Sequence, residues 1–299
     1  MIVDNISDYL VPLVKKLFGI SDMTLFLRRK KQDFEKLFFH KKYTAEDIVR
    51  CLEEMGVERG KPIIVHSSMH NFYNYNGSAD ELIDKLIEYV GDNGTLCMPA
   101  FPSDKYNINN IFDVKQTPSA AGYLSEVFRK RAGVKRSLNK LHSVCALGKD
   151  ADIITGDHHN SEICFDKHSP FYLIGQMGGY IVNLGMPRWY VGTGEHVCEA
   201  LLYNKLSFFK DKFSNTYEFT YRDEKGIEIK HTMKTRSKVP YIRRTDTKLF
   251  DMYFDSSKFK RKRLSNIWIT VFDMKYLYER LSELALEGIV IYSSPKFYK

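Results

Sequence analysis

The stretch GTGEHVCEA, at residues 192–200, places His196 three positions before Glu199. On a helix, residues three positions apart project from the same side. A neutral imidazole can remove a proton from an attacking group near neutral pH, and a carboxylate beside it could hold a cationic substrate. The same spacing also suits a histidine on a half-buried helix next to a solvated acid, so the pattern alone leaves both interpretations open.

Two further polar features could contribute chemistry. Ser67 and Ser68 follow the apolar run PIIV and one histidine, and the N–H groups and hydroxyls of such a turn can bind a phosphate or a carbonyl group. A polar turn after a strand is nevertheless a common structural feature. His142 and His168 are isolated in the sequence, and each taken alone is predicted to be structural.

Several familiar site patterns are missing. The chain has no GxGxxG after a strand, no GxxxxGK[ST], no GxSxG and no HExxH, which argues against dinucleotide, P-loop, serine-hydrolase and zinc-protease sites. The five cysteines form no CxxC pair, so we expect no metal site and no disulfides, but buried free thiols in a reducing cytoplasm. His158 and His159, in the polar segment GDHHNSE, are predicted to be exposed.

The elements that would position these residues begin near residue 44, where helical segments alternate with short apolar runs. Ser78 and Glu81 have the spacing of a capping box at the start of one helix. The alternation predicts an α/β domain with a central sheet, and His196 follows the strand YIVNLG at the sheet edge where ligands usually bind. An antiparallel hairpin is expected at 217–234, either joining or flanking the sheet, followed by a closing helix and strand at 272–294.

Charge and hydropathy narrow the class of protein. The net charge is +8, with basic runs at 27–42 and 258–264. A basic chain can favour nucleic acid, an anionic membrane surface or a phosphorylated small molecule, but no nucleic-acid motif is present and we interpret both runs as solvated surface. No window of 18 apolar residues occurs, so we expect no membrane span. Residues 1–42 are predicted to form an amphipathic helical arm.

Four segments, taken in order, resemble the aminoglycoside 3-N-acetyltransferase family, whose fold differs from that of the GNAT class. They cover roughly residues 45–205, and their order and spacing are more specific than any one of them alone. The segments are IIVHSSMHNFYNYNGSADELIDKLIEYVGDNGTLCMPAF, FDVKQTPSAAGYLSEVFRKRAGVKRSLNKLHSVCALGKDA, HSPFYLIGQMGGYIVNLG and TGEHVCEA.

The resemblance implies acetyl transfer from acetyl-CoA to an amine by direct attack. His196 matches the family's proposed general base, and Glu199 matches the acid of the same block and a contact to the acceptor. A base of this kind typically contributes about 10²–10⁴-fold to the rate. Ser67 and Ser68 match the turn near the thioester and the pantetheine arm.

Other matched positions concern the CoA site and the acceptor side. The resemblance places Arg136 and Ser143 along the CoA site, and His142 at a variable histidine on the acceptor side. Where the family has His-Pro, this chain has Asn139 and Lys140. Because the arm and the hairpin also differ from resistance enzymes, the acceptor stays open between an aminoglycoside antibiotic and an amino sugar of a surface polysaccharide or nucleotide sugar.

Together, the alternation and the resemblance predict an α/β/α sandwich around a mixed sheet over residues 43–299, preceded by the helical arm. The predicted protein is a cytoplasmic enzyme that binds no nucleic acid and no metal, and the sequence leaves a homo-oligomer open. The alternative is a non-catalytic binding module of the same fold, which would dock a partner or a membrane through its basic arm.

Overall fold

In the computed structural model of the chain, residues 23–103, 111–235 and 249–291 are described. The chain divides into two units, Met1–Lys42 and Tyr43–Lys299. The described part of the first unit contains one helix, α2 (Met23–Lys36). The other segment for which the sequence predicts helix, 8–20, lies outside the described residues.

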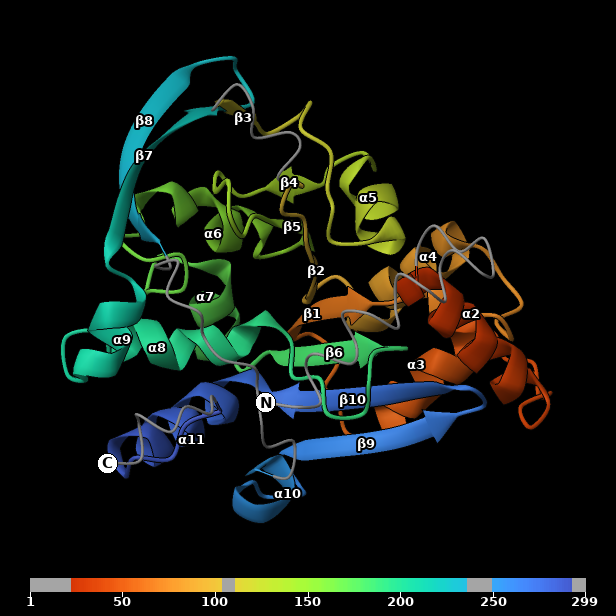
Figure 1. Cartoon of the computed structure of the whole chain (residues 1–299). Helices are drawn as coiled ribbons and strands as arrows, with labels where there is room; N and C mark the ends of the chain where they lie inside the picture. Colours follow the sequence, from red (N-terminus) through yellow and green to blue (C-terminus); the bar gives the residue numbers. More distant parts are fainter. Residues whose placement is uncertain (1–22, 104–110, 236–248, 292–299) are drawn as a thin grey trace. The chain divides into compact units, whose positions relative to one another are not determined.

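The second unit is built on a seven-stranded mixed sheet (Figure 1). Its central strand β1 (Pro62–Ser67) pairs in parallel with β2 (Thr95–Pro99) on one side and with β6 (Tyr180–Leu184) on the other. The remaining strands join in antiparallel fashion. On the β2 side these are β5 (Val144–Gly148) and β4 (Lys135–Arg136), and on the β6 side β10 (Ile267–Asp273) and β9 (Phe259–Leu264).

Alternate residues of the strands face two separate cores. On β1, Ile63 and Val65 belong to one hydrophobic cluster and Ile64 belongs to the other, as the period of two along a strand requires. The first cluster includes the buried faces of α3 (Ala45–Glu54), α4 (Ala79–Val90) and α5 (Tyr123–Arg129). The second includes those of α6 (Ala151–Gly156), α7 (Pro170–Gln176), α8 (Val197–Leu201) and α11 (Met274–Leu286). The predicted α/β/α sandwich around a mixed sheet is thus confirmed.

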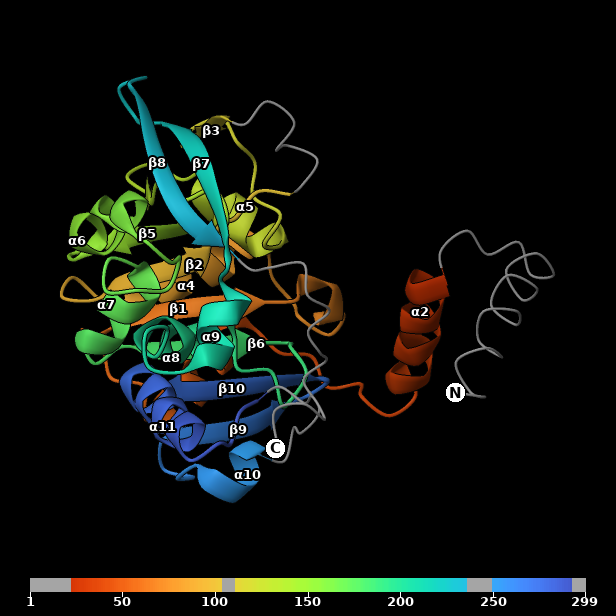
Figure 2. The ribbon, with the colours of Figure 1, turned by 60° about the vertical axis from the view of Figure 1, so that its left-hand side comes forward.

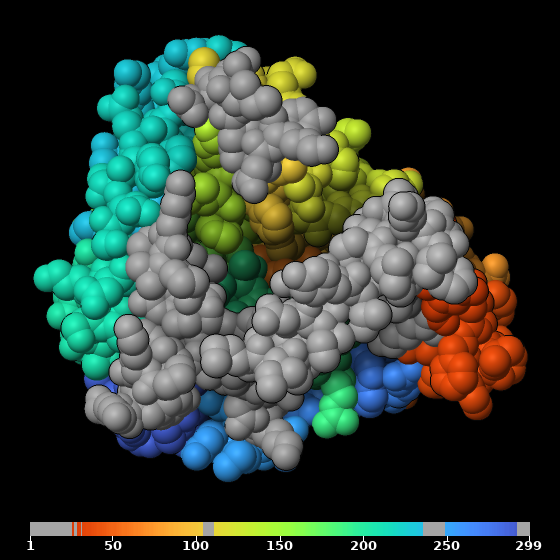
Figure 3. Space-filling view, in the orientation of Figure 1, coloured from red at the N-terminus to blue at the C-terminus, as the bar shows by residue number. Residues whose placement is uncertain are grey.

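The predicted hairpin is confirmed as β7 (Asn215–Arg222) and β8 (Glu228–Thr235), but it does not enter the main sheet. Together with β3 (Ile111–Asp113) it forms a separate three-stranded sheet, which stands above the sandwich in Figure 2. His231 fastens β8 to the domain by donating from Nε2 to the carbonyl of Ser161 at 3.3 Å. In Figure 3 the surface is hollowed between this hairpin, in cyan, and the yellow-green segment that contains α5.

The local helix signals behave as the sequence indicates. Ser78 and Glu81 form the reciprocal capping box of α4. The second basic run forms the edge strand β9. Lys262 on this strand pairs with Glu54, and Lys258 just before it pairs with Asp273. Of the predicted closing strand, residues 288–291 carry no strand and the remainder lies outside the described residues.

Two properties of the described residues bear on membrane insertion and on metal binding. In that part of the chain no helix has the length and hydropathy needed to cross a bilayer. The same part contains no group of three or more histidine, cysteine or acidic side chains suited to a metal ion. All five cysteines are free and buried.

Candidate active site

The segment GTGEH forms a 3₁₀ turn, η4 (Thr193–His196), directly after the loop that follows β6. Two glycines allow it to approach the sheet. Gly192 has a φ of 81°, and a Cβ there would lie 2.8 Å from Cε1 of His66. A Cβ on Gly194 would lie 2.5 Å from Cδ1 of Ile181. Gly192 is therefore required for the close contact that brings Thr193 onto the end of β1, and Gly194 lets the turn pack against Ile181.

His66 is the residue that receives this contact. The Thr193 N–H lies 3.4 Å from its Nε2 and the Thr193 hydroxyl lies 2.8 Å from it. Because an amide N–H can only donate, Nε2 is the accepting nitrogen and the imidazole is neutral. Burial lowers the pKa of His66 to about 3. No sequence motif includes His66 as a functional residue, although a histidine inside an apolar strand is a signal of a buried, partnered side chain.

His196 and Glu199 come together as the helical spacing predicts. Nδ1 of His196 lies 3.0 Å from Oε1 of Glu199, and the Glu199 carboxylate is completely buried. A third residue joins them, since Nζ of Lys212 donates to the same Oε1 at 2.6 Å. Lys212 ends α9 (Ser207–Lys212) and is itself buried. No sequence pattern pointed to Lys212, which lies 13 residues beyond Glu199 and on another helix.

This neighbourhood bears on the expected contact between Glu199 and a cationic substrate. Oε1 is shared by two protein groups, and the side chain is only 1% exposed. The geometry therefore favours a role in holding His196 over direct contact with an acceptor. His196 keeps more access to solvent, with its side chain 12% exposed.

An aromatic ring connects His196 to His142. The Phe165 ring centroid lies 5.0 Å from that of His196 and 4.5 Å from that of His142. His142 also receives its position from the preceding loop, where its N–H donates to the Oδ1 of Asn139. The histidine predicted to be the base and the histidine predicted for the acceptor side thus both contact one aromatic ring.

The serine turn lies at the carboxyl end of β1, as predicted. Ser67 pairs in register with Leu184 of β6, and the N–H of Ser68 donates to the Leu184 carbonyl at 3.0 Å. Both serines are half-buried. Gly122, which precedes α5, approaches the carbonyl of Ser67 closely, because a Cβ there would lie 3.5 Å from it. The turn is therefore enclosed by the ends of two strands and one helix.

Arg136 and Ser143 are deeper than a ligand-facing role requires. The Arg136 guanidinium donates to the carbonyls of Ala100, Thr117 and Val114, and Nε donates to Ser143 Oγ at 3.4 Å. Ser143 is completely buried and donates to the Ala100 carbonyl at 2.8 Å. Burial lowers the pKa of Arg136 to about 10. This pair cross-links three loops, and its expected contact with a bound cofactor stays a prediction.

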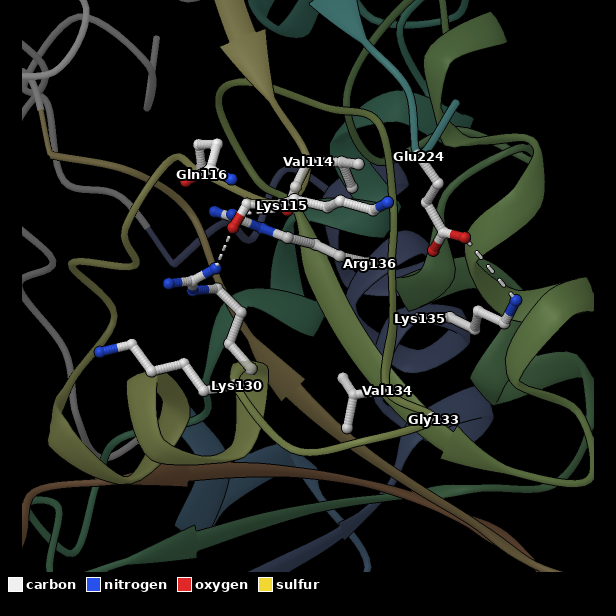
Figure 4. Close-up of a pocket in the computed structure, with 10 residues that line it drawn as sticks. Val114, Lys115, Gln116, Lys130, Gly133, Val134, Lys135, Arg136 and Glu224 are labelled. Atoms are coloured by element: carbon white, nitrogen blue, oxygen red, sulfur yellow. Dashed lines mark hydrogen bonds and ion pairs between the residues drawn. The ribbon is translucent and has the colours of Figure 1, made fainter. Parts of the chain in front are cut away.

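A basic pocket of about 590 Å³ opens beside Arg136 (Figure 4). Lys130 lies on one side of it, and Lys135 with Glu224 lies on the opposite side. Lys130 is 3.1 Å from Glu126, and Lys135 is 3.9 Å from Glu224, so both are partly compensated. Lys115 completes the cationic lining. The pocket suits an anion better than an apolar ligand.

The prediction that His158 is exposed is wrong. His158 is completely buried, where Nε2 donates to the Cys164 carbonyl at 2.9 Å and Nδ1 accepts from the Ser137 hydroxyl at 2.9 Å. His159 is partly buried, and burial lowers its pKa. The polar sequence around the pair concealed this, because the 3₁₀ turn η3 (His158–Asn160) directs one ring inward.

Replacement of Arg136 should affect folding. Arg136→Ala removes the donors of three backbone carbonyls and should lower the free energy of unfolding by on the order of 3 kcal/mol. Urea denaturation measures this, with Arg188→Ala as the control, because Arg188 is 56% exposed and its ion pair with Asp251 spans 3.8 Å. Equal stability of the two variants would contradict the cross-linking role.

Stability should fall in acid partly because of His158. Burial lowers its pKa to about 3, whereas in the unfolded chain the ordinary value is about 6.5. Below that value the unfolded state binds a proton that the folded state refuses, so stability is lost as the pH falls from about 6.5 toward 3. His158→Gln should flatten this dependence by about 1.4 kcal/mol per pH unit, measured by urea denaturation across the range. The exposed His70→Gln is the control, and an unchanged slope for His158→Gln would exclude this titration.

Known proteins resemble this chain over most of its length. The model of the family described as aminoglycoside 3-N-acetyltransferase matches residues 64–285. The aminoglycoside N(3')-acetyltransferase-like protein YokD, from the SPbeta prophage of Bacillus subtilis, is 27% identical over 163 residues, which are 48% of this chain. The aligned part spans 60% of that relative's own length.

Solved structures share the fold. AAC-IIIb in its binary complex with CoASH superposes with a TM-score of 0.67 and 18% identity, covering 85% of this chain and 100% of that one. AAC-VIa bound to sisomicin superposes with a TM-score of 0.65 and 18% identity, covering 82% and 98%. The resemblance inferred from the sequence is confirmed, and this chain belongs to the aminoglycoside 3-N-acetyltransferase family.

Proposed function

We propose that this chain transfers an acetyl group from acetyl-CoA to an amine of an amino sugar, with His196 as the general base. The contact of 3.0 Å between His196 Nδ1 and Glu199 Oε1 carries this proposal. A carboxylate accepts the proton of Nδ1, so Nε2, at the far end of the ring, bears the lone pair that a base needs. Membership of the family and the relative solved with CoASH support the choice of donor.

The reaction requires few groups from the protein. The acceptor amine attacks the thioester carbonyl while His196 takes its proton, and a C–N bond forms. The C–S bond then breaks, and His196 returns the proton to the departing sulfur, so that CoA leaves as the thiol. Negative charge develops on the carbonyl oxygen before that bond breaks. A fixed donor aimed at such an oxygen contributes about 3 kcal/mol to transition-state stabilisation, and the hydroxyl groups of Ser67 and Ser68, in the half-buried turn, are proposed to provide it.

The phosphates of the donor are proposed to occupy the basic pocket. Helix α5 connects the two places, because Gly122 at its start approaches the carbonyl of Ser67 and Arg129 at its end lines the pocket. The helix has seven residues, which span about 10 Å at the helical rise. A pantetheine arm can bridge that separation, which would put the thioester at the serine turn and the phosphates beside Lys115 and Lys130.

The acceptor is proposed to be an amino sugar with a free amine. A relative of the same fold is solved with sisomicin, an aminoglycoside, and aminoglycosides are therefore the first acceptors to test. Amino sugars of surface polysaccharides and nucleotide sugars are the second panel. His142 is proposed to face the acceptor, because its ring contacts Phe165, which also contacts the ring of the base.

Loss of the base should remove activity without unfolding the protein. His196→Ala should lower kcat by about 10²–10⁴-fold, measured as thiol release from acetyl-CoA with each acceptor panel and confirmed by the mass of the product. His70→Ala, at an exposed position, is the control. A folded His196→Ala protein with near wild-type turnover would exclude His196 as the base. A folded wild-type chain that binds CoA but acetylates no acceptor of either panel would favour a binding module.

Donor binding should depend on the charges of the basic pocket. Lys115→Glu and Lys130→Glu should each weaken CoA binding in calorimetry by at least about tenfold, because each variant turns a favourable contact with phosphate into repulsion. Lys149→Glu is the control, because the Lys149 N–H bonds to the Gly94 carbonyl, at the opposite ends of the strands from the serine turn. Unchanged affinity in both pocket variants would place the phosphates elsewhere.

A further inference from the structure

Glu199 and Lys212 form a buried ion pair next to His196. Glu199 Oε1 lies 3.0 Å from His196 Nδ1 and accepts from Lys212 Nζ at 2.6 Å. The side chains of Glu199 and Lys212 are 1% and 3% exposed. The three groups come from η4, α8 and α9, so the chain brings a cation from a separate helix to a carboxylate that already contacts the candidate base.

The structural consequence of this pair is clear. A buried carboxylate without a compensating charge is costly, and removing one member of a buried pair usually destabilises a protein strongly. That consequence alone would make Lys212 a structural residue. The position of His196 on the same carboxylate oxygen adds a second consequence, which concerns protonation.

A lone carboxylate beside a histidine stabilises the imidazolium form, and a base that is already protonated cannot accept a proton. A cation beside the pair acts in the opposite direction. Lys212 Nζ and His196 Nδ1 contact the same oxygen atom, so they lie within the range of roughly 4–6 Å over which a charge moves a titration by one to three pH units. Lys212 therefore offsets the effect of Glu199 on His196.

We infer that Lys212 is a positioning residue of the reaction, which holds Glu199 in place and keeps His196 in its neutral, proton-accepting form near neutral pH. The inference rests on the proposed function and names a residue that its mechanism does not otherwise use. Lys212 touches neither reacting group; it acts on His196 through the shared carboxylate.

Another side chain next to the pair responds to the same two charges. Burial raises the pKa of the Cys198 thiol well above its ordinary value, the charge of Glu199 raises it further, and the charge of Lys212 lowers it. Among the residues that the structure describes, Glu195 is a further ionisable group near the ring of His196, and its Oε1 lies 3.8 Å from Nε2. Beyond Phe165 lies His142. A second carboxylate at this distance strengthens the need for a nearby cation.

The test compares Lys212→Met with Lys212→Arg, and uses Lys210→Met as the matched control on the exposed side of the same helix. Two quantities are measured for each: the pH at the midpoint of the acid limb of the kcat profile, and the midpoint of the His196 ring titration by NMR without substrates. Lys212→Met should raise both midpoints by about one pH unit or more. At acidic pH each unit corresponds to about a tenfold lower rate. Lys212→Arg and Lys210→Met should remain near the wild-type values.

Two results would overturn the inference: unchanged midpoints in a folded Lys212→Met protein, or midpoints that move toward lower pH. A lower melting temperature with unmoved midpoints would mean that Lys212 is structural only. If Lys212→Met does not fold, Glu199→Gln is compared with Glu199→Gln/Lys212→Met, and the NMR midpoint should be higher in the double variant. The NMR titration needs no acceptor, so it decides the role of Lys212 even where acetyl transfer itself fails to appear.

Discussion

The parallel pairing of β1 with β6 is the constraint on which the rest of this molecule depends. It places Ser67 beside Leu184, so the two strands end at the same edge of the sheet. The loop after β6 then returns over the end of β1 and places Thr193 on His66. Since η4 begins at Thr193, the position of His196 relative to the serine turn follows from this register. A slip of one residue would turn every side chain of β6 to the opposite core.

Burial governs the electrostatics of the whole site. A polar group that is removed from water needs an internal partner, and three buried side chains of the site have a specific one. His66 accepts from Thr193, Arg136 donates to three backbone carbonyls, and Glu199 receives a cation from another helix. These contacts explain why several residues that were expected to contact ligands instead form hydrogen bonds or ion pairs with other groups of the protein. The two serines and His196, in contrast, are less deeply buried than Glu199 and Lys212.

The second sheet and the basic pocket lie at the periphery of the domain, where the proposed function places the phosphates of the donor. The hairpin β7–β8 forms one margin of the hollow seen in Figure 3, and its turn contributes Glu224 to the pocket. The cations that line the pocket come from the loop after β3, from α5 and from β4. An edge strand, a short helix and a loop thus supply charges that the central sheet could not present. The division suits a protein whose central strands carry the chemistry while its periphery selects the ligands.

Much of the fold could be predicted because its signals are local. The capping box of Ser78, the alternation of strands and helices, and the turn between β7 and β8 depend on residues that are close in sequence. The contact between His196 and Glu199 was predictable for the same reason, since one helical turn separates them. The family motifs added the order of the segments and the candidate ligand-binding residues, but not how deeply those side chains are buried.

Only the tertiary structure decided which polar side chains are buried and which helices meet. Lys212 contacts Glu199 because α9 packs beside α8. Neither helix has a sequence pattern that predicts its contact with the other. His158 is buried although its sequence surroundings are polar, because a 3₁₀ turn directs the ring toward Ser137 and Cys164. Contacts of this kind depend on how separate elements pack, and packing is set by the shape of the whole core rather than by the spacing of residues along the chain.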